Sequence, residues 1–248
     1  MTLDFFKRKY GYEIDGVWFP RVTTITSSVR EGWPGLRRAA EWGTSVHEAI
    51  EGILRGESVL YEPRLAVTIK TFVEWQNAFP IKIRDPQNDI EFRVVDLEHG
   101  YAGTVDVVAE VDGVLGIVDL KTSTAIVREH ALQTAAYLNA YNAMRENHEK
   151  CKTRWILRVD QYQQCVGCLA KKREKYGRAR VAGQSANWRA CNHQWSDLKG
   201  EVEFRELAAY EKDLEAFFAL KERWEWANKE WLGKIPNYEK SIRPVELP

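Results

Sequence analysis

The sequence lacks the features that mark membrane, secreted or disulfide-bonded proteins. No apolar run approaches the roughly 18 residues that a transmembrane helix requires. The opening MTLDFFKRKYGYEIDG has no apolar stretch of the kind found in secretory signals. Four cysteines in 248 residues suit a reducing compartment better than a disulfide scaffold. We therefore expect a soluble, cytoplasmic protein without a membrane partner.

The sequence also lacks an excess of charge of either sign, because 36 Lys and Arg balance 36 Asp and Glu. This balance argues against a uniformly basic nucleic-acid coat. One segment is nevertheless basic: residues 171–191 contain seven basic side chains and one acid. We expect this segment to contact phosphates of DNA. Its candidate residues are Lys171, Lys172, Arg173, Lys175, Arg178 and Arg180.

Hydrophobic periodicity predicts an α/β fold with the core order α-β-β-β-α-β. The dipeptide Asp112-Gly113 is a two-residue hairpin signal, so the strands on either side should be adjacent and antiparallel. The predicted helices are 36–56, 62–79, 128–147 and 208–232. The predicted strands are 89–96, 101–111, 114–120, 153–160 and 202–207, preceded by a hairpin and an extended segment in 12–27.

The chain is expected to contain one main domain and one insertion. Residues 1–160 and 195–248 form the main domain. Residues 161–194 are rich in glycine, basic residues and cysteine, and we expect them to interrupt a hairpin. The tail from Ile235 onwards contains three prolines and is expected to be loop or poorly ordered.

Two carboxylates and one ammonium group are expected on one face of the sheet. Asp106 lies in GTVDVV, and Asp119 and Lys121 lie in GIVDLKTS. Alternation along a strand gives Asp119 and Lys121 the same face, and strand pairing can bring Asp106 to it. Taken alone, each acid fits a solvated strand face. Both acids interrupt apolar runs, however, and hard oxygen ligands of this kind favour Mg²⁺ or Mn²⁺.

Two helical pairs add candidate ligands and positioning groups. His47 and Glu51 are four residues apart, as are Gln133 and Tyr137, so each pair shares one helix face. An imidazole ligand at His47 would favour Mn²⁺ over Mg²⁺. For each pair taken in isolation, a polar or ion-paired helix face is the simpler interpretation.

Taken together and in this order, these residues resemble the PD-(D/E)xK nuclease superfamily. The His motif and the Q-x-x-x-Y helix are similar to its RecB-like branch, which includes CRISPR-associated and mitochondrial genome maintenance exonucleases. The resemblance covers about residues 18–140. The motifs are GTSVHEAIE with His47, DIEFRV with Glu91, GTVD with Asp106, VDLKTS with Asp119 and Lys121, and LQTAAY with Gln133 and Tyr137.

The resemblance implies a restriction-endonuclease-like αβββαβ core, with a central mixed sheet flanked by helices, that hydrolyses DNA phosphodiester bonds with Mg²⁺ or Mn²⁺. It implies that Lys121 activates water, and that Gln133 and Tyr137 position the substrate or the lysine. Glu91 matches an acidic position beside the ligands, and Glu51 is placed with it. The metal ligands implied are His47, Asp106, Asp119 and the carbonyl of Leu120.

The cysteines predict a second, structural metal site. Cys165 and Cys168 in QCVGCLAKK, with Cys191 and His193 in RACNHQW, look like two knuckles of a zinc-ribbon-like insertion. Cys151 could replace His193, and unrelated free cysteines in a loop are the alternative. All four cysteines follow the motifs of the active site, whereas the iron–sulfur members of the family place one upstream. We therefore do not expect an iron–sulfur cluster.

The leading hypothesis is a deoxyribonuclease, most simply an exonuclease on single strands or DNA ends. Its setting would be repair, recombination or phage DNA processing in a prokaryotic or phage-infected cell. A second hypothesis is a non-catalytic DNA-binding or assembly module that uses the same fold and the basic insertion. A third, a zinc-stabilised RNA-binding protein, depends on the insertion alone and leaves GTVD and VDLK unexplained.

Overall fold

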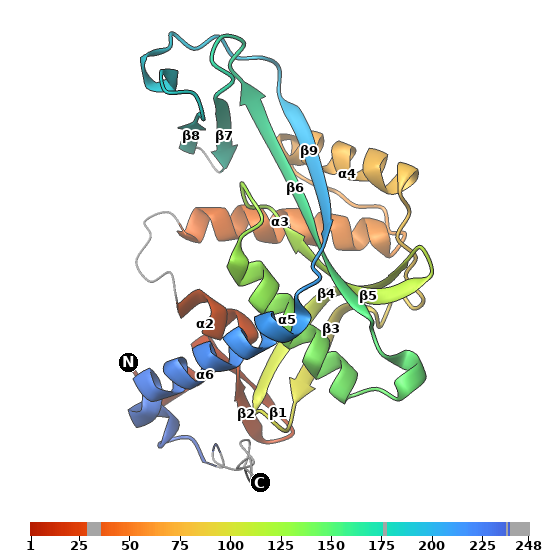
Figure 1. The fold of residues 1–248 in the computed structure, drawn as a ribbon, viewed down its shortest axis with the longest axis vertical. Coiled ribbons are helices and arrows are strands. Elements are labelled where there is room, and N and C mark those ends of the chain that lie inside the picture. The colour runs from red at the N-terminus through yellow and green to blue at the C-terminus, as the bar shows by residue number, and fades with distance from the viewer. Residues whose placement is uncertain (29–35, 176–177, 237, 239–248) are drawn as a thin grey trace.

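The computed structural model describes residues 1–28, 36–175, 178–236 and 238 (Figure 1). The side chains of residues 36–39 and 178 are outside this description. The α-helices are α1 (Leu3–Tyr10), α2 (Val22–Ser27), α3 (Leu36–Leu54), α4 (Ala66–Ala78), α5 (Arg128–Ala143) and α6 (Tyr210–Leu232). The strands are β1 (Gly11–Ile14), β2 (Val17–Pro20), β3 (Ile90–Asp96), β4 (Tyr101–Val111), β5 (Val114–Lys121), β6 (Thr153–Gln164), β7 (Lys171–Lys175), β8 (Arg178–Ala182) and β9 (Lys199–Glu206).

The centre of the fold is a seven-stranded mixed sheet in the order β3-β4-β5-β6-β7-β8, in which β9 also pairs with β6. Strands β5 and β6 are parallel because α5 connects them as a crossover, and the other pairs are antiparallel. The predicted hairpin between β4 and β5 is confirmed, with Val111 opposite Val114. Asp112 and Gly113 both have positive φ, of 49° and 79°, as a tight two-residue turn of this kind requires.

Helices cover both faces of this sheet and define two cores (Figure 1). On one face α2, α5 and α6 pack around Tyr101, Val105 and Phe217. On the other face α3 and α4 pack around Val107 and Leu157. Because both faces are covered, the strands are long apolar runs. All residues of β5 from Leu115 to Leu120 are buried, including a single charged residue.

The N-terminal and C-terminal segments differ from the sequence prediction. Residues 22–27 form helix α2 rather than an extended segment, since this places Val22 and Ile25 in the core without any exposure. The preceding helix α1 was not predicted. The tail after α6 also begins inside the core, where Tyr238 packs on Trp18 with ring centroids 5.8 Å apart. Residues 237 and 239–248 of the predicted loop lie outside the described residues.

Most of the predicted insertion lies at the far end of the β6–β9 hairpin (Figure 1). Strand β6 continues through Gln164, so the sheet extends into the segment 161–194 that the sequence set apart. The β7–β8 hairpin then folds back and pairs with the last two residues of β6. Within the described part of the chain, no helix is long and apolar enough to span a bilayer.

Candidate active site and Cys/His cluster

The candidate active site forms where β4 and β5 meet α3. Asp106 on β4 accepts a hydrogen bond of 2.6 Å from the backbone N–H of Leu120 on β5. This bond ties the two strands together next to Asp119, whose side chain is fully buried. His47 on α3 faces the same carboxylate, with Nδ1 3.9 Å from Asp106 Oδ2. The structure therefore brings together three residues that the sequence separates by up to 72 positions.

Two polar groups fix the orientation of Asp119. Lys121 Nζ lies 2.6 Å from Asp119 Oδ2, as expected for neighbours on one strand face. From α5, Gln133 Nε2 donates to Asp119 Oδ1 at 3.0 Å and to the Tyr137 hydroxyl at 3.1 Å. The ring of Tyr137 packs against Gly103. A Cβ at this position would lie only 2.4 Å from Tyr137 Cε1, so only glycine leaves room for the ring.

Two further acids lie beside this group. Glu51, one helical turn after His47, is buried, and burial together with the carboxylates of Glu91 and Asp106 raises its pKa to about 7. Glu91 is exposed on the edge strand β3 with a positive φ of 57°. A strained, non-glycine backbone of this kind is often found at functional sites. Both acids are among the predicted site residues, but the sequence does not predict this backbone conformation of Glu91.

An open pocket of about 540 Å³ gives access to the site from the side of α3. Three of its lining residues, Gly43, Thr44 and Glu48, were not among the predicted site residues. The signal was present, because Gly43 precedes His47 by one helical turn and Glu48 follows Thr44 by four residues. The full lining is Gly43, Thr44, His47, Glu48, Glu51 and Glu91.

The candidate site combines a neutral imidazole with buried carboxylates. Burial, followed by the field of Lys121, lowers the pKa of His47 to about 4, so the imidazole is neutral at pH 7 and offers a lone pair. Asp119 Oδ2 is buried and forms an ion pair with Lys121, but it accepts no hydrogen bond from the other residues that the structure describes. These oxygen and nitrogen donors fit Mg²⁺ or Mn²⁺ chemically.

The same acids give the stability a defined pH dependence. Burial raises the pKa of both Asp106 and Asp119 from 3.8 to about 6, against the opposing effect of Lys121. Between about pH 4 and pH 6, the folded chain therefore keeps protons that the unfolded chain has released. The stabilising contribution of these two groups is complete below this range and is lost as the pH rises through it.

A bound cation would compensate this loss, so we expect Mn²⁺ to stabilise the protein more at pH 7.5 than at pH 5. At saturating Mn²⁺ the melting temperature should rise by about 5–10 °C at pH 7.5. At pH 5 the shift should be less than half as large, because protons compete for the same oxygens. The measurement is thermal unfolding with and without Mn²⁺. An Asp106→Asn/Asp119→Asn double variant should lose the difference, and an equal shift at both pH values would contradict the assignment.

The Cys/His cluster forms where β6 leaves the sheet. The sulfur and nitrogen atoms of Cys165, Cys168, Cys191 and His193 all lie within 4.8 Å of one another. Cys165 Sγ is 3.8 Å from Cys191 Sγ, and Cys168 Sγ is 3.4 Å from His193 Nδ1. Three thiols and one imidazole are a zinc-type ligand set, so the cluster could hold a metal such as zinc. Among the described residues, the acids of the candidate site do not form an equally compact group.

Cys151 does not belong to this cluster, so the idea that it could replace His193 is wrong. It is buried in the core between α5 and β6, where its backbone N–H donates to Asn142 Oδ1 at 2.9 Å. Burial raises the pKa of its thiol to about 12. At Cys165, by contrast, the backbone N–H of Cys168 is the main cause that lowers the thiol pKa to about 5. A thiolate at this position is suited to metal ligation.

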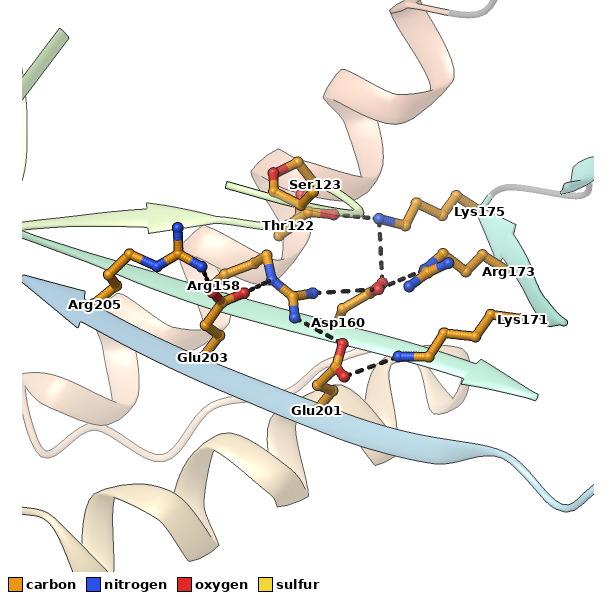
Figure 2. A network of polar contacts seen from close by, with 11 residues as sticks. Thr122, Ser123, Arg158, Asp160, Lys171, Arg173, Lys175, Glu201, Glu203 and Arg205 are labelled. Atoms are coloured by element: carbon orange, nitrogen blue, oxygen red, sulfur yellow. Dashed lines mark hydrogen bonds and ion pairs between the residues drawn. The ribbon is translucent and has the colours of Figure 1, made fainter. Parts of the chain in front are cut away.

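The basic residues of the insertion are less available than their sequence suggested (Figure 2). Lys171 pairs with Glu201 at 2.9 Å, and Arg173 and Lys175 pair with Asp160 at 2.5 and 3.5 Å. Lys172 Nζ lies 5.6 Å from the ring of Trp195. Arg180 is exposed on β8, and the side chain of Arg178 lies outside the described residues. DNA contact by this segment stays a prediction, but Lys171, Arg173 and Lys175 form ion pairs within the protein.

The candidate site thus combines an open pocket, buried acids, a paired lysine and a neutral histidine, contributed by α3, β3, β4, β5 and α5. A separate Cys/His cluster lies at the far end of β6. Neither a scan against models of known protein families nor a search of curated proteins finds a match to this chain.

Proposed function

We propose that this chain is a metal-dependent deoxyribonuclease of the PD-(D/E)xK superfamily, similar to its RecB-like branch, with a restriction-endonuclease-like core. The observation that supports this most is the grouping around Asp119: a buried carboxylate paired with Lys121, beside Asp106 and within reach of Gln133. A purely structural ion pair would not need the additional buried acid or the open pocket next to it.

The residues of the site have separate roles in this proposal. His47, Asp106, Asp119 and the Leu120 carbonyl would hold Mg²⁺ or Mn²⁺, and a metal bound there would supply a water of lowered pKa and a positive charge facing a phosphate oxygen. The ammonium of Lys121, 2.6 Å from Asp119, orients that water and stabilises the negative charge that develops on the phosphate. Gln133 keeps Asp119 in place, and Tyr137 supports Gln133.

Exonuclease action on single strands or DNA ends is the form of the activity that we propose, in repair, recombination or phage DNA processing. The test uses end-labelled single-stranded and duplex DNA, with each end either free or blocked, in Mg²⁺, Mn²⁺ or excess chelator. We expect cleavage that requires a metal and a free end. Cleavage of circular DNA would replace exonuclease by endonuclease action, and cleavage in chelator would contradict the metal-dependent mechanism.

A non-catalytic DNA-binding module remains the second candidate, and the same assay distinguishes it. It would bind DNA in a salt-sensitive way without cleaving it. The internal pairing of Lys171, Arg173 and Lys175 makes this candidate weaker, because these charges were its main support.

A further inference from the structure

Asp160 on β6 is a fully buried carboxylate that no role at the active site accounts for. Three cations surround it: Arg173 Nε at 2.5 Å, and Arg158 Nη1 and Lys175 Nζ at 3.5 Å each (Figure 2). Its Oδ1 makes no hydrogen bond to a described residue, so Lys175 is the cation that balances this oxygen. A buried charge of this kind is stable only with such partners.

Two acids on β9, Glu201 and Glu203, hold the cations around Asp160 in place. Arg158 donates to Glu203 at 2.8 Å and to Glu201 at 2.7 Å, both on β9, and Lys171 pairs with Glu201. The β7 strand is therefore attached to β6 and β9 through a continuous set of ion pairs (Figure 2). Arg173 and Lys175 are the residues of β7 that reach inwards to Asp160.

This set of ion pairs lies next to the end of β5, the strand that carries Asp119 and Lys121. Strands β5 and β6 are parallel, and Lys121 pairs in register with Arg158. The ammonium of Lys175 also donates a hydrogen bond to the backbone carbonyl of Thr122, the residue that follows Lys121. Lys175 thus connects Asp160 to the point where β5 ends (Figure 2).

Thr122 is in addition close to the pocket wall. A Cβ on Gly43 of α3 would lie 3.3 Å from Thr122 Oγ1, so the threonine fits against this glycine. Thr122 is therefore held between α3, which carries His47, and β7, which carries Lys175. A shift of Thr122 would move Lys121 and alter its distance to Asp119.

The Cys/His cluster lies at the start of β7, the strand that carries Lys175. Cys165 N–H donates to the carbonyl of Ala170 at 2.8 Å, so the turn that carries Cys165 and Cys168 leads directly into β7. From 165 to 198, the only buried described residues are Cys165 and Ala170. The hairpin has almost no core of its own, and its position depends on the cluster at one end and on the Asp160 ion pairs at the other.

We propose that Lys175, balanced by Asp160, is a positioning residue that fixes the end of β5 and thereby the Lys121 ammonium. In this view the β7–β8 hairpin completes the active site from one end of the sheet, and the pairing of its basic residues serves this purpose. The inference rests on the proposed nuclease function, but the order of the β5 end can be measured without it.

The test compares Lys175→Met with Lys199→Met, a control that removes an exposed lysine of β9 outside the ion pairs of Asp160. The first readout is amide hydrogen exchange in residues 119–125. We expect Lys175→Met to accelerate this exchange by about tenfold or more, and Lys199→Met to leave it unchanged. The second readout is kinetic: Lys175→Met should lower kcat by roughly tenfold and change KM by less than about threefold.

The variant Lys175→Arg is the control for a general loss of folding in Lys175→Met. Arginine keeps a cationic donor, so protection of residues 119–125 should be restored to near the wild-type level. Wild-type exchange in Lys175→Met, or no restoration in Lys175→Arg, would overturn the inference. So would a rise in KM with unchanged exchange, which would mean that Lys175 contacts DNA directly. A wild-type protein without nuclease activity would contradict the proposed function, whereas the exchange data would still decide the role of Lys175.

Discussion

Replacement of Lys121 by alanine is expected to lower the rate of DNA cleavage by about 10³-fold. The ammonium group is 2.6 Å from a fully buried carboxylate and is itself mostly shielded, with 17% of its side chain exposed. No other described cation forms an ion pair with Asp119. Its removal therefore takes away both the charge that stabilises the reacting phosphate and the group that orients water.

The measurement is single-turnover cleavage of end-labelled DNA in Mn²⁺, with circular dichroism to verify the fold. The matched control is Lys82→Ala, which removes an exposed lysine that belongs to none of the site motifs and should keep wild-type activity. Lys121→Arg should recover only part of the rate, because a planar guanidinium does not reproduce the point charge of an ammonium. Full activity in Lys121→Ala would refute the assigned role.

Replacement of Cys191 by alanine is expected to abolish zinc binding and to destabilise the folded structure of residues 165–198. Metal binding contributes roughly 10–16 kcal/mol of apparent folding free energy in zinc-finger peptides. The segment 165–198 buries almost nothing else, so it has little to replace that contribution. We expect the purified wild type to contain about one zinc per chain.

Zinc content by mass spectrometry and limited proteolysis of residues 165–198 measure this effect. Cleavage within the segment should accelerate by more than about tenfold in Cys191→Ala. Cys151→Ala is the matched control, since that thiol lies in the core and should not affect metal content. Wild type without metal, or Cys191→Ala with unchanged metal and protease resistance, would contradict a structural zinc site.

The sequence predicted the central strands well because local and tertiary preferences agree there. Strand β4 has the predicted limits and β5 ends one residue later, since the Asp112-Gly113 turn fixes their register. Residues 22–27 show the opposite case. The β-branched run VTTITS favours a strand, but helix α2 buries Val22 and Ile25 and allows Thr26 Oγ1 to donate to the carbonyl of Val22. Tertiary burial outweighs the local preference.

The candidate site was predictable where one element supplies the pattern. Alternation places Asp119 with Lys121, and helical spacing places Gln133 with Tyr137. What the sequence could not give are contacts between elements, such as the hydrogen bond from the Leu120 N–H to Asp106.

The ion pairs of the basic segment 171–191 were also unpredictable, because they join different elements. Its cations appeared unmatched because their partners come from other strands: Asp160 on β6 and Glu201 on β9. Local charge counting considers only neighbours in the sequence, and so it predicted a free basic arm. In the folded chain, Lys171, Arg173 and Lys175 of this segment form internal ion pairs.

The most direct measurement is single-turnover cleavage of single-stranded DNA as a function of Mn²⁺ concentration, in the wild type and in Asp119→Asn. The amide is nearly isosteric with the carboxylate but removes the buried charge between Lys121 and Gln133. We predict saturable, Mn²⁺-dependent cleavage by the wild type and a loss of at least about 10³-fold in the variant. No cleavage by the wild type at any Mn²⁺ concentration, or equal cleavage by both proteins, would contradict a nuclease site at Asp119.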